Sequence, residues 1–141
     1  SATVPPENAV PVAVVDSKPV STATVMRVEA FVNNWAQSWS NADIKNYLAA
    51  YSQYFTTDDG KKIGQWSEHR RQRLQSAGKT RVDVQDLHVY VDMSRQQAIV
   101  EFLQSYTSTT YRDRTAKQLL LTLEDNSWRI LAERVIAQLP D

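Results

Sequence analysis

The spacing of apolar residues changes once along the chain, at Gly78, and this change constrains the fold more than any other feature. Before Gly78, large apolar residues recur every three or four positions, which is the period of an amphipathic helix. Beyond it they alternate with polar residues, which is the period of a strand with one buried face. Helices followed by strands in this order predict an α+β domain.

Three segments before the change carry the helical pattern. In the second, NADIKNYLAAYSQYF over residues 41–55, we expect Asn41 to cap the helix and Asp43 to lie in its first turn, where the helix dipole favours an acid. A third helix is expected over residues 62–78, because a glycine such as Gly78 suits the left-handed position that ends a helix. The first helix begins near residue 22, and its apolar side consists of Val25, Val28, Phe31, Val32, Trp35 and Trp39.

Four segments beyond Gly78 alternate with period two and predict strands, which short turn-like joints favour pairing antiparallel. A bulge near Gln85 and Asp86 in the first strand would keep its inward residues on one face of a bent strand. We therefore expect a strongly curved antiparallel sheet of about four main strands, with the three helices packed in its concave face. The connection TSTTYRDRT, residues 107–115, is either a longer loop or the ends of two long strands. The inward residues of the first strand are Val82, Val84, Leu87, Val89 and Val91.

The first 22 residues differ from the remainder in composition. They are rich in Pro, Val, Ala and Ser and lack a helical period, which is typical of an extended linker. We therefore expect a tether over residues 1–22 and one domain over residues 23–141, since a chain of this length has room for one core. The alternative is that AVPVAVV, residues 9–15, forms a short edge strand docked on the sheet. The prolines of this segment are Pro5, Pro6, Pro11 and Pro19.

Charge and composition exclude several classes of function. The 16 Lys and Arg residues balance the 16 Asp and Glu residues, so no overall field attracts nucleic acid or an anionic membrane. The chain has no cysteine, which excludes a thiolate zinc site and a cysteine nucleophile. No apolar run is long enough to span a bilayer. We therefore expect neither a nucleic-acid partner nor a membrane span in this chain.

Motifs for catalysis and for metal or cofactor binding are also missing. His69 and His88 have no second histidine or carboxylate at ligand spacing. The chain contains no Gly-x-Ser-x-Gly turn, and Gly60, Gly64 and Gly78 do not form a phosphate-binding loop. We therefore expect no metal and no cofactor, and we assign no catalytic residue.

The order of elements and several local phrases resemble the nuclear transport factor 2-like superfamily, which includes ketosteroid isomerase and polyketide cyclases. The phrases are FVNNWAQSWSNADIKNYLAAYSQYF, WSEHRRQRL, VDVQDLHVYV, AIVEFLQSY, KQLLLTL and SWRILAE, within residues 25–135. More narrowly, they are similar to a domain of bacterial envelope proteins, often appended to L,D-transpeptidase-type murein enzymes or to tetratricopeptide repeats. The resemblance implies a small-molecule pocket at the open end of a cone, a homodimer through the exposed sheet face, and a periplasmic or cell-envelope location.

The third predicted helix carries the most basic stretch of the chain, WSEHRRQRLQ over residues 66–75. Arg70 and Arg73 share a side of the helix with Trp66 and Leu74. His69 and Arg71 point elsewhere, so some basic residues must face solvent. Arginine binds carboxylates and phosphates at two points, so a cell-wall polymer, a lipid head group, a phosphate or another small anionic ligand could bind here. The alternative is a solvated helix side. The residues of this expected anion or partner patch are Lys61, Lys62, Arg70, Arg71 and Arg73.

A pocket inside the cone would need polar residues on inward faces. Lys117 shares a strand face with Leu119 and Leu121, and an unpaired buried ammonium is costly, so Glu133 is its expected partner. A structural ion pair and a catalytic dyad are both consistent with this pairing, although the base and acid of the isomerases cannot be traced in the sequence. The residues expected to line the pocket are Tyr47, Tyr51, Gln104, Tyr106, Lys117 and Glu133.

Three functions remain open. The first is a non-catalytic accessory domain of a bacterial envelope protein that acts in dimerisation, partner docking or small-ligand binding. The second is a small pocket enzyme of the ketosteroid isomerase or polyketide cyclase kind. The third is an adaptor that uses the basic helix in a secretion or wall-synthesis assembly.

Overall fold

The computed structural model describes residues 20–140 of the 141-residue chain. The predicted tether over residues 1–22, with its alternative edge strand at 9–15, falls almost wholly outside the described residues. Three helices precede four strands, which confirms the predicted α+β class and the order of elements. The elements are α1 (Thr22–Ser40), α2 (Ile44–Ala49), α3 (Ile63–Ser76), β1 (Thr80–Asp92), β2 (Gln97–Ser108), β3 (Arg112–Glu124) and β4 (Ser127–Leu139).

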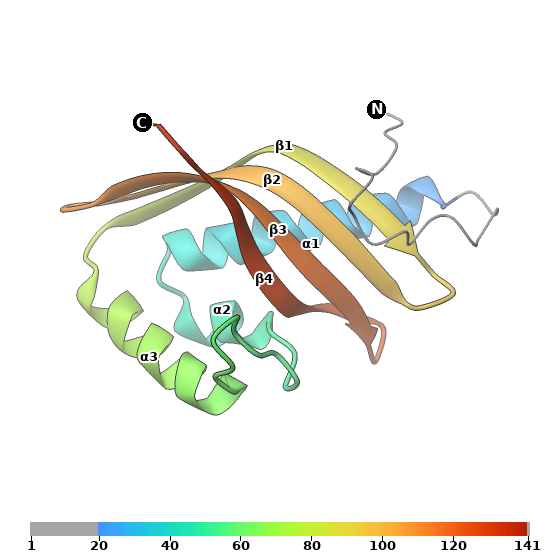
Figure 1. Cartoon of the computed structure of the whole chain (residues 1–141), viewed down its shortest axis with the longest axis horizontal. Coiled ribbons are helices and arrows are strands. Elements are labelled where there is room, and N and C mark those ends of the chain that lie inside the picture. The colour runs from blue at the N-terminus through green and yellow to red at the C-terminus, as the bar shows by residue number, and fades with distance from the viewer. Residues whose placement is uncertain (1–19, 141) are drawn as a thin grey trace.

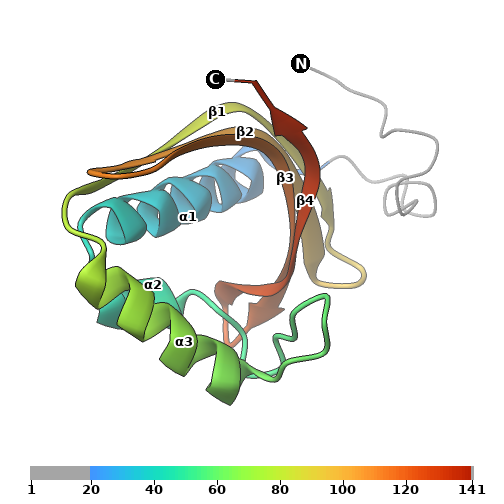
Figure 2. The same cartoon turned by 60° about the vertical axis from the view of Figure 1, so that its left-hand side comes forward.

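The strands form one antiparallel sheet in the order β1-β2-β3-β4, which curves into an open arch (Figures 1 and 2). α1 lies within the concave side of the arch, and α2 and α3 lie on the side of α1 away from the top of the sheet (Figure 2). The register between β1 and β2 shifts between Gln85 and His88, where Asp86 has a φ of 55°. This irregularity confirms the predicted bulge and lets β1 bend around the helix.

The core lies between the three helices and the concave face of the sheet. The predicted apolar side of α1 is buried at Val28, Val32, Trp35 and Trp39, whose exposed fractions are 0–6%. Each large side chain removed from water in this way contributes roughly 1.5–3 kcal/mol. From the sheet, the core receives Val100, Phe102, Leu119, Leu121 and Ile130.

The prediction for the second helix was wrong in its bounds. Asn41 ends α1 instead of capping α2, and Asp43 is the N-cap, with its side chain accepting a hydrogen bond from the backbone N–H of Asn46. The helix stops at Ala49 because the chain then pairs with β4. The Ser52 backbone N–H donates to Ile130 at 2.9 Å, and the Ile130 N–H donates to Ala50 at 2.8 Å.

The remaining joints agree with the sequence patterns. α3 ends at Ser76, and Gly78 adopts the left-handed conformation two residues later, with a φ of +71°. The segment TSTTYRDRT forms the ends of two long strands, because β2 extends to Ser108 and β3 begins at Arg112. The Ser108 N–H donates to the Tyr111 carbonyl at 2.8 Å across the turn. The long hairpin therefore extends beyond the end of α1.

Candidate functional site

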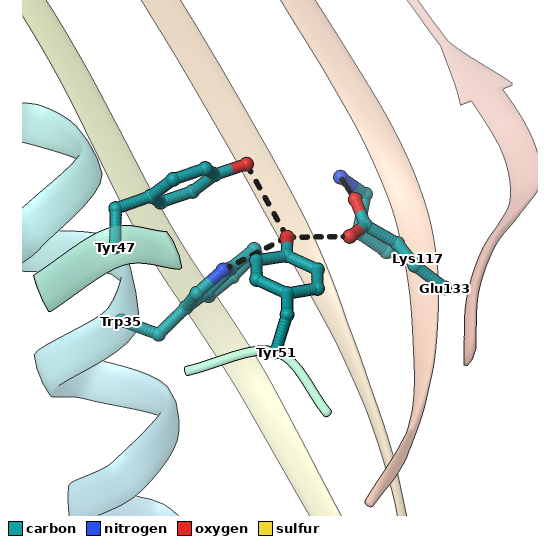
Figure 3. A network of polar contacts seen from close by, with 5 residues as sticks. All are labelled: Trp35, Tyr47, Tyr51, Lys117 and Glu133. Carbon is teal, nitrogen blue, oxygen red and sulfur yellow. Dashed lines mark hydrogen bonds and ion pairs between the residues drawn. The ribbon is translucent and has the colours of Figure 1, made fainter. Parts of the chain in front are cut away.

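A buried hydrogen-bond network joins α1, α2 and the two last strands, with the Tyr51 hydroxyl at its centre (Figure 3). Tyr51 donates to Glu133 Oε1 at 2.7 Å and accepts from Trp35 Nε1 at 3.1 Å. The hydroxyls of Tyr47 and Tyr51 lie 3.3 Å apart. Because the Tyr51 proton is used on Glu133, the Tyr47 hydroxyl is the donor of that contact.

An ion pair continues the network into β3. Lys117 Nζ lies 2.8 Å from Glu133 Oε2, and the side chains are 6% and 12% exposed. The same ammonium lies 5.3 Å from the centre of the Trp39 ring and 5.8 Å from that of Trp35, so cation–π attraction adds to the ion pair. The predicted pairing of Lys117 with Glu133 therefore occurs, in a position that supports the structure of the core.

The protonation states of the network follow from burial and charge. Burial raises the pKa of Tyr47 and Tyr51, so both phenols stay protonated and serve as donors. Burial also opposes ionisation of Glu133, but the Lys117 ammonium and the Arg70 guanidinium outweigh it and lower the pKa of that carboxyl. Glu133 is thus a carboxylate with both oxygens engaged, which makes it a poor base.

A cavity of about 500 Å³ lies next to the network. It lies between α3 and the sheet, where it is bordered by the parts of β2 and β3 next to the turn that joins them and by Val135 of β4. Gln104 and Thr115 are cross-strand partners on the wall of this cavity, and Lys117 follows on the same face of β3. Tyr106, Tyr111 and other residues border it from β2 and the β2–β3 turn. The volume falls within the range of small-molecule sites.

Two buried polar atoms on this wall have no hydrogen-bond partner among the described residues, namely Gln104 Oε1 and Thr115 Oγ1. Gln104 is 4% and Thr115 is 3% exposed. Buried polar groups in folded proteins are nearly always hydrogen-bonded, so an unpartnered neighbouring pair is unusual. Neither atom borders the two other cavities of similar size.

The other side of the cavity is cationic. Arg70 projects from α3, with its guanidinium carbon 5.5 Å from the centre of the Trp39 ring and 5.6 Å from that of Trp66. Neither Arg70 nor Arg73, which also lines the cavity, forms a salt bridge with any described residue. The two arginines therefore retain their capacity to bind an anion.

The structure divides both sets of predicted site residues. Of the expected pocket residues, Gln104, Tyr106 and Lys117 line the cavity, and Glu133 lies behind Lys117. Tyr47 and Tyr51 belong to the buried network and do not border the cavity. Tyr47 is on the buried face of α2, and Tyr51 follows the helix with its side chain in the core.

The expected basic patch is also split. Arg70 and Arg73 line the cavity, whereas the side chain of Arg71 is 47% exposed and lies 3.8 Å from Glu68. Lys61 is exposed beside Asp59, and Lys62 is the N-cap residue of α3. Sequence reasoning missed Thr115, although its position two residues before Lys117 places it on the same strand face.

The part of the chain from residue 20 to 140 contains no group of three metal-ligating side chains. Within the same residues, no helix combines the length and hydrophobicity that a membrane span requires.

Sequence comparison identifies the family. The profile described as the Cds6 C-terminal NTF2-like domain matches residues 27–134. The chain belongs to this family. The predicted nuclear transport factor 2-like superfamily is therefore confirmed, and the match covers all of the helices and strands except residues 22–26 of α1 and 135–139 of β4. No curated protein sequence matches the chain.

Solved structures share the fold of this NTF2-like domain at low sequence identity. Bd1075 from Bdellovibrio bacteriovorus is 22% identical with a TM-score of 0.76, over 86% of this chain and 44% of that one. The helical cell shape determining protein Pgp2 from Campylobacter jejuni is 18% identical with a TM-score of 0.75, over 82% of this chain and 41% of that one. A protein of unknown function with a cystatin-like fold from Nostoc punctiforme is 11% identical with a TM-score of 0.67, over 84% and 93%. The chain thus spans less than half of the first two proteins.

Proposed function

We propose that this NTF2-like domain is a non-catalytic accessory domain of a bacterial cell-envelope protein, and that it binds a small anionic ligand in the cavity beside α3. One observation carries the proposal. Two arginines that form no salt bridge within residues 20–140 border a wall with two buried polar atoms that have no hydrogen-bond partner among the same residues. The envelope location is supported by the fold shared with a cell shape determining protein.

The hydrogen bonds and the ion pair formed by Glu133 and Asp113 favour ligand binding over catalysis. Glu133 is fixed by Lys117 and Tyr51, and its lowered pKa suits a structural anion. A general base of the isomerase kind instead needs a free carboxylate within reach of its substrate. Asp113, which borders the cavity, is half-buried and accepts a hydrogen bond from Gln138. Neither carboxylate therefore has the setting of a catalytic base.

Arg70→Met and Arg71→Met form a matched pair for testing this function, because both arginines belong to α3 but only Arg70 borders the cavity. A panel of small carboxylates is titrated against the 141-residue chain and both variants, and binding is followed by the rise in melting temperature. A ligand at about 100 times its Kd stabilises the folded state by about 2.7 kcal/mol. We expect the rise in the wild type and in Arg71→Met and its loss in Arg70→Met. Equal rises in all three, or none in the wild type, would exclude the cavity as the anion site.

Self-association through the convex sheet face is a second proposal, favoured by one apolar row across all four strands. Tyr90 pairs with Ile99, Ile99 with Leu120, and Leu120 with Ala132, so the four side chains share the face opposite α1. When two copies are related by a two-fold axis, such a row on one copy can pack against the same row on the other. Sedimentation should then show a dimer in the wild type and a monomer in Leu120→Glu. A monomer at all concentrations of the wild type would remove this proposal.

A further inference from the structure

The wall of the cavity is incomplete as a hydrogen-bonding surface. Gln104 and Thr115 are neighbours across β2 and β3, and both are more than nine-tenths buried. Each has an oxygen with no hydrogen-bond partner in the described part of the chain. A side-chain amide both donates and accepts, so it can pair with a peptide group at two points. The Thr115 hydroxyl beside it can donate or accept as well. The two unpartnered oxygens can each accept a hydrogen bond, so they favour a ligand with an N–H donor. The side-chain N–H of Gln104 can donate to a carbonyl of the same ligand.

The guanidinium of Arg70 is held in place by two tryptophans. The Trp39 and Trp66 rings lie against it at 5.5 and 5.6 Å, and this arrangement leaves its N–H groups free of any salt bridge within the described residues. A fixed guanidinium with unused donors binds a carboxylate in two-point fashion at a low entropic cost.

The charge of the site limits the ligand further. Lys117 is neutralised by Glu133, and Asp113 at the cavity offsets one of the two remaining arginines, Arg70 and Arg73. One positive charge remains, which matches a single carboxylate better than a doubly charged phosphate. Apolar surface for the rest of the ligand comes from Leu74, Tyr106, Tyr111 and Val135.

We propose that the cavity recognises an α-amido carboxylate, which is the chemistry shared by the carboxyl-terminal residue of a short peptide and by an N-acyl amino acid. Arg70 binds the carboxylate, Gln104 pairs with the adjoining amide, and Thr115 adds a hydrogen bond. This inference rests on the proposed function and names the ligand class of the same site.

The test uses isothermal titration of the 141-residue chain with four probes. N-acetyl-alanyl-alanine carries the carboxylate and the amide, and N-acetyl-alanine is the single-residue form. N-acetyl-alanyl-alanine amide lacks the charge, and butyrate lacks the amide. We expect the two acids to bind, and the amidated peptide and butyrate to bind about 10-fold more weakly or worse, because each loses one of the two recognition elements. The tighter of the two acids identifies the peptide or the N-acyl amino acid as the better fit.

Two variants separate recognition from structure. Gln104→Leu should weaken binding of N-acetyl-alanyl-alanine about 5- to 10-fold and leave butyrate unchanged, because it removes only the amide contact. Its melting temperature should stay the same or rise, since an unpartnered buried polar group is replaced by an apolar one. Arg70→Met should weaken both ligands, and Arg71→Met neither.

The outcomes are distinct. If butyrate binds as tightly as N-acetyl-alanyl-alanine, the cavity binds anions but the α-amido carboxylate is wrong. The same conclusion follows if Gln104→Leu leaves peptide binding unchanged, or if it lowers the melting temperature and weakens both ligands equally. If no carboxylate binds at all, the proposed function fails together with the inference.

Discussion

The ammonium of Lys117 lies 2.8 Å from the carboxylate of Glu133, between the cavity on one side and the buried tyrosines on the other. This pair allows the domain to hold a lysine in the wall of its cavity without an uncompensated charge. It also fixes Glu133 as the acceptor for Tyr51. The cation left for an external anion is therefore Arg70, supported by Arg73, and not Lys117.

Removal of Lys117 should be costly. In Lys117→Met, the buried Glu133 carboxylate loses its nearest positive charge, and breaking a buried pair from one side costs about 3–5 kcal/mol. We expect the free energy of unfolding in urea to fall by about this amount. The double variant Lys117→Met/Glu133→Gln should recover part of the loss, because the amide that replaces the carboxylate is neutral and can still accept from Tyr51. A single variant as stable as the wild type would show that the pair contributes nothing.

The contribution of Glu133 should depend on pH. Its pKa is lowered in the folded state, since Lys117 and Arg70 outweigh the effect of burial. In the unfolded chain a glutamate has a pKa of about 4.3. The unfolded state therefore binds more protons between the two values. The stabilisation is fully present above about pH 4.3 and is lost as the pH falls through the folded value. The difference in unfolding free energy between wild type and Glu133→Gln should shrink from about pH 6 to about pH 3. A constant difference would contradict the assigned charge.

Substitution of two glycines by alanine should change the stability of the domain in opposite directions. Gly78 has a φ of +71°, and an added Cβ would lie 3.4 Å from Thr109 Oγ1, so Gly78→Ala should destabilise by about 1–2 kcal/mol. Gly64 lies in α3 with nothing within 4 Å of an added Cβ, so Gly64→Ala should stabilise by about 0.5 kcal/mol. Thermal unfolding of both variants checks the pair. Equal effects would mean that the chain after α3 does not turn as described.

Replacing the buried hydroxyl of Thr115 by an apolar group should stabilise the ligand-free domain, because this hydroxyl has no partner among the described residues. Thr115→Val preserves the shape of the side chain and replaces the buried oxygen by a methyl group. We expect stability to rise by about 1 kcal/mol, measured by urea unfolding without ligand. Thr122→Val, at a half-buried position on the opposite face of β3, is the control and should change stability by less than about 0.5 kcal/mol. A loss of stability in Thr115→Val would mean that its hydroxyl has a partner in the folded protein.

The sequence predicted the fold to the extent that local periodicity determines it. The apolar side of α1, including Val28 and Trp35, has a helical period because one face of that helix is buried. The alternation in β1 required a bulge near Asp86, and the bulge is present. The length of α2 could not be predicted in this way, because it ends where Ser52 pairs with Ile130, a contact between residues distant in sequence.

The candidate site was predicted less completely than the fold, because contacts between residues distant in sequence bring its side chains together. Lys117 and Glu133 could be paired, since a lysine in an apolar row requires a counter-charge. Helical spacing already separates Arg71 from Arg70 and Arg73, in agreement with the structure. It does not specify that Arg70 packs against Trp39 of α1. Thr115 has no sequence signal beyond the parity that it shares with Lys117. Thr115 is distinguished only in the structure, where its buried hydroxyl has no hydrogen-bond partner among the described residues.

The most direct test of anion binding beside α3 is a nuclear magnetic resonance titration of the 141-residue chain with N-acetyl-alanyl-alanine. The signals to follow are the Arg70 Nε–H, the Gln104 side-chain amide and the Thr115 backbone N–H. We predict that all three shift along one saturating curve, while the Nε–H of Arg71 stays in place. Saturating shifts at Arg71 without shifts at Arg70 and Gln104, or no saturable shift at all, would contradict it.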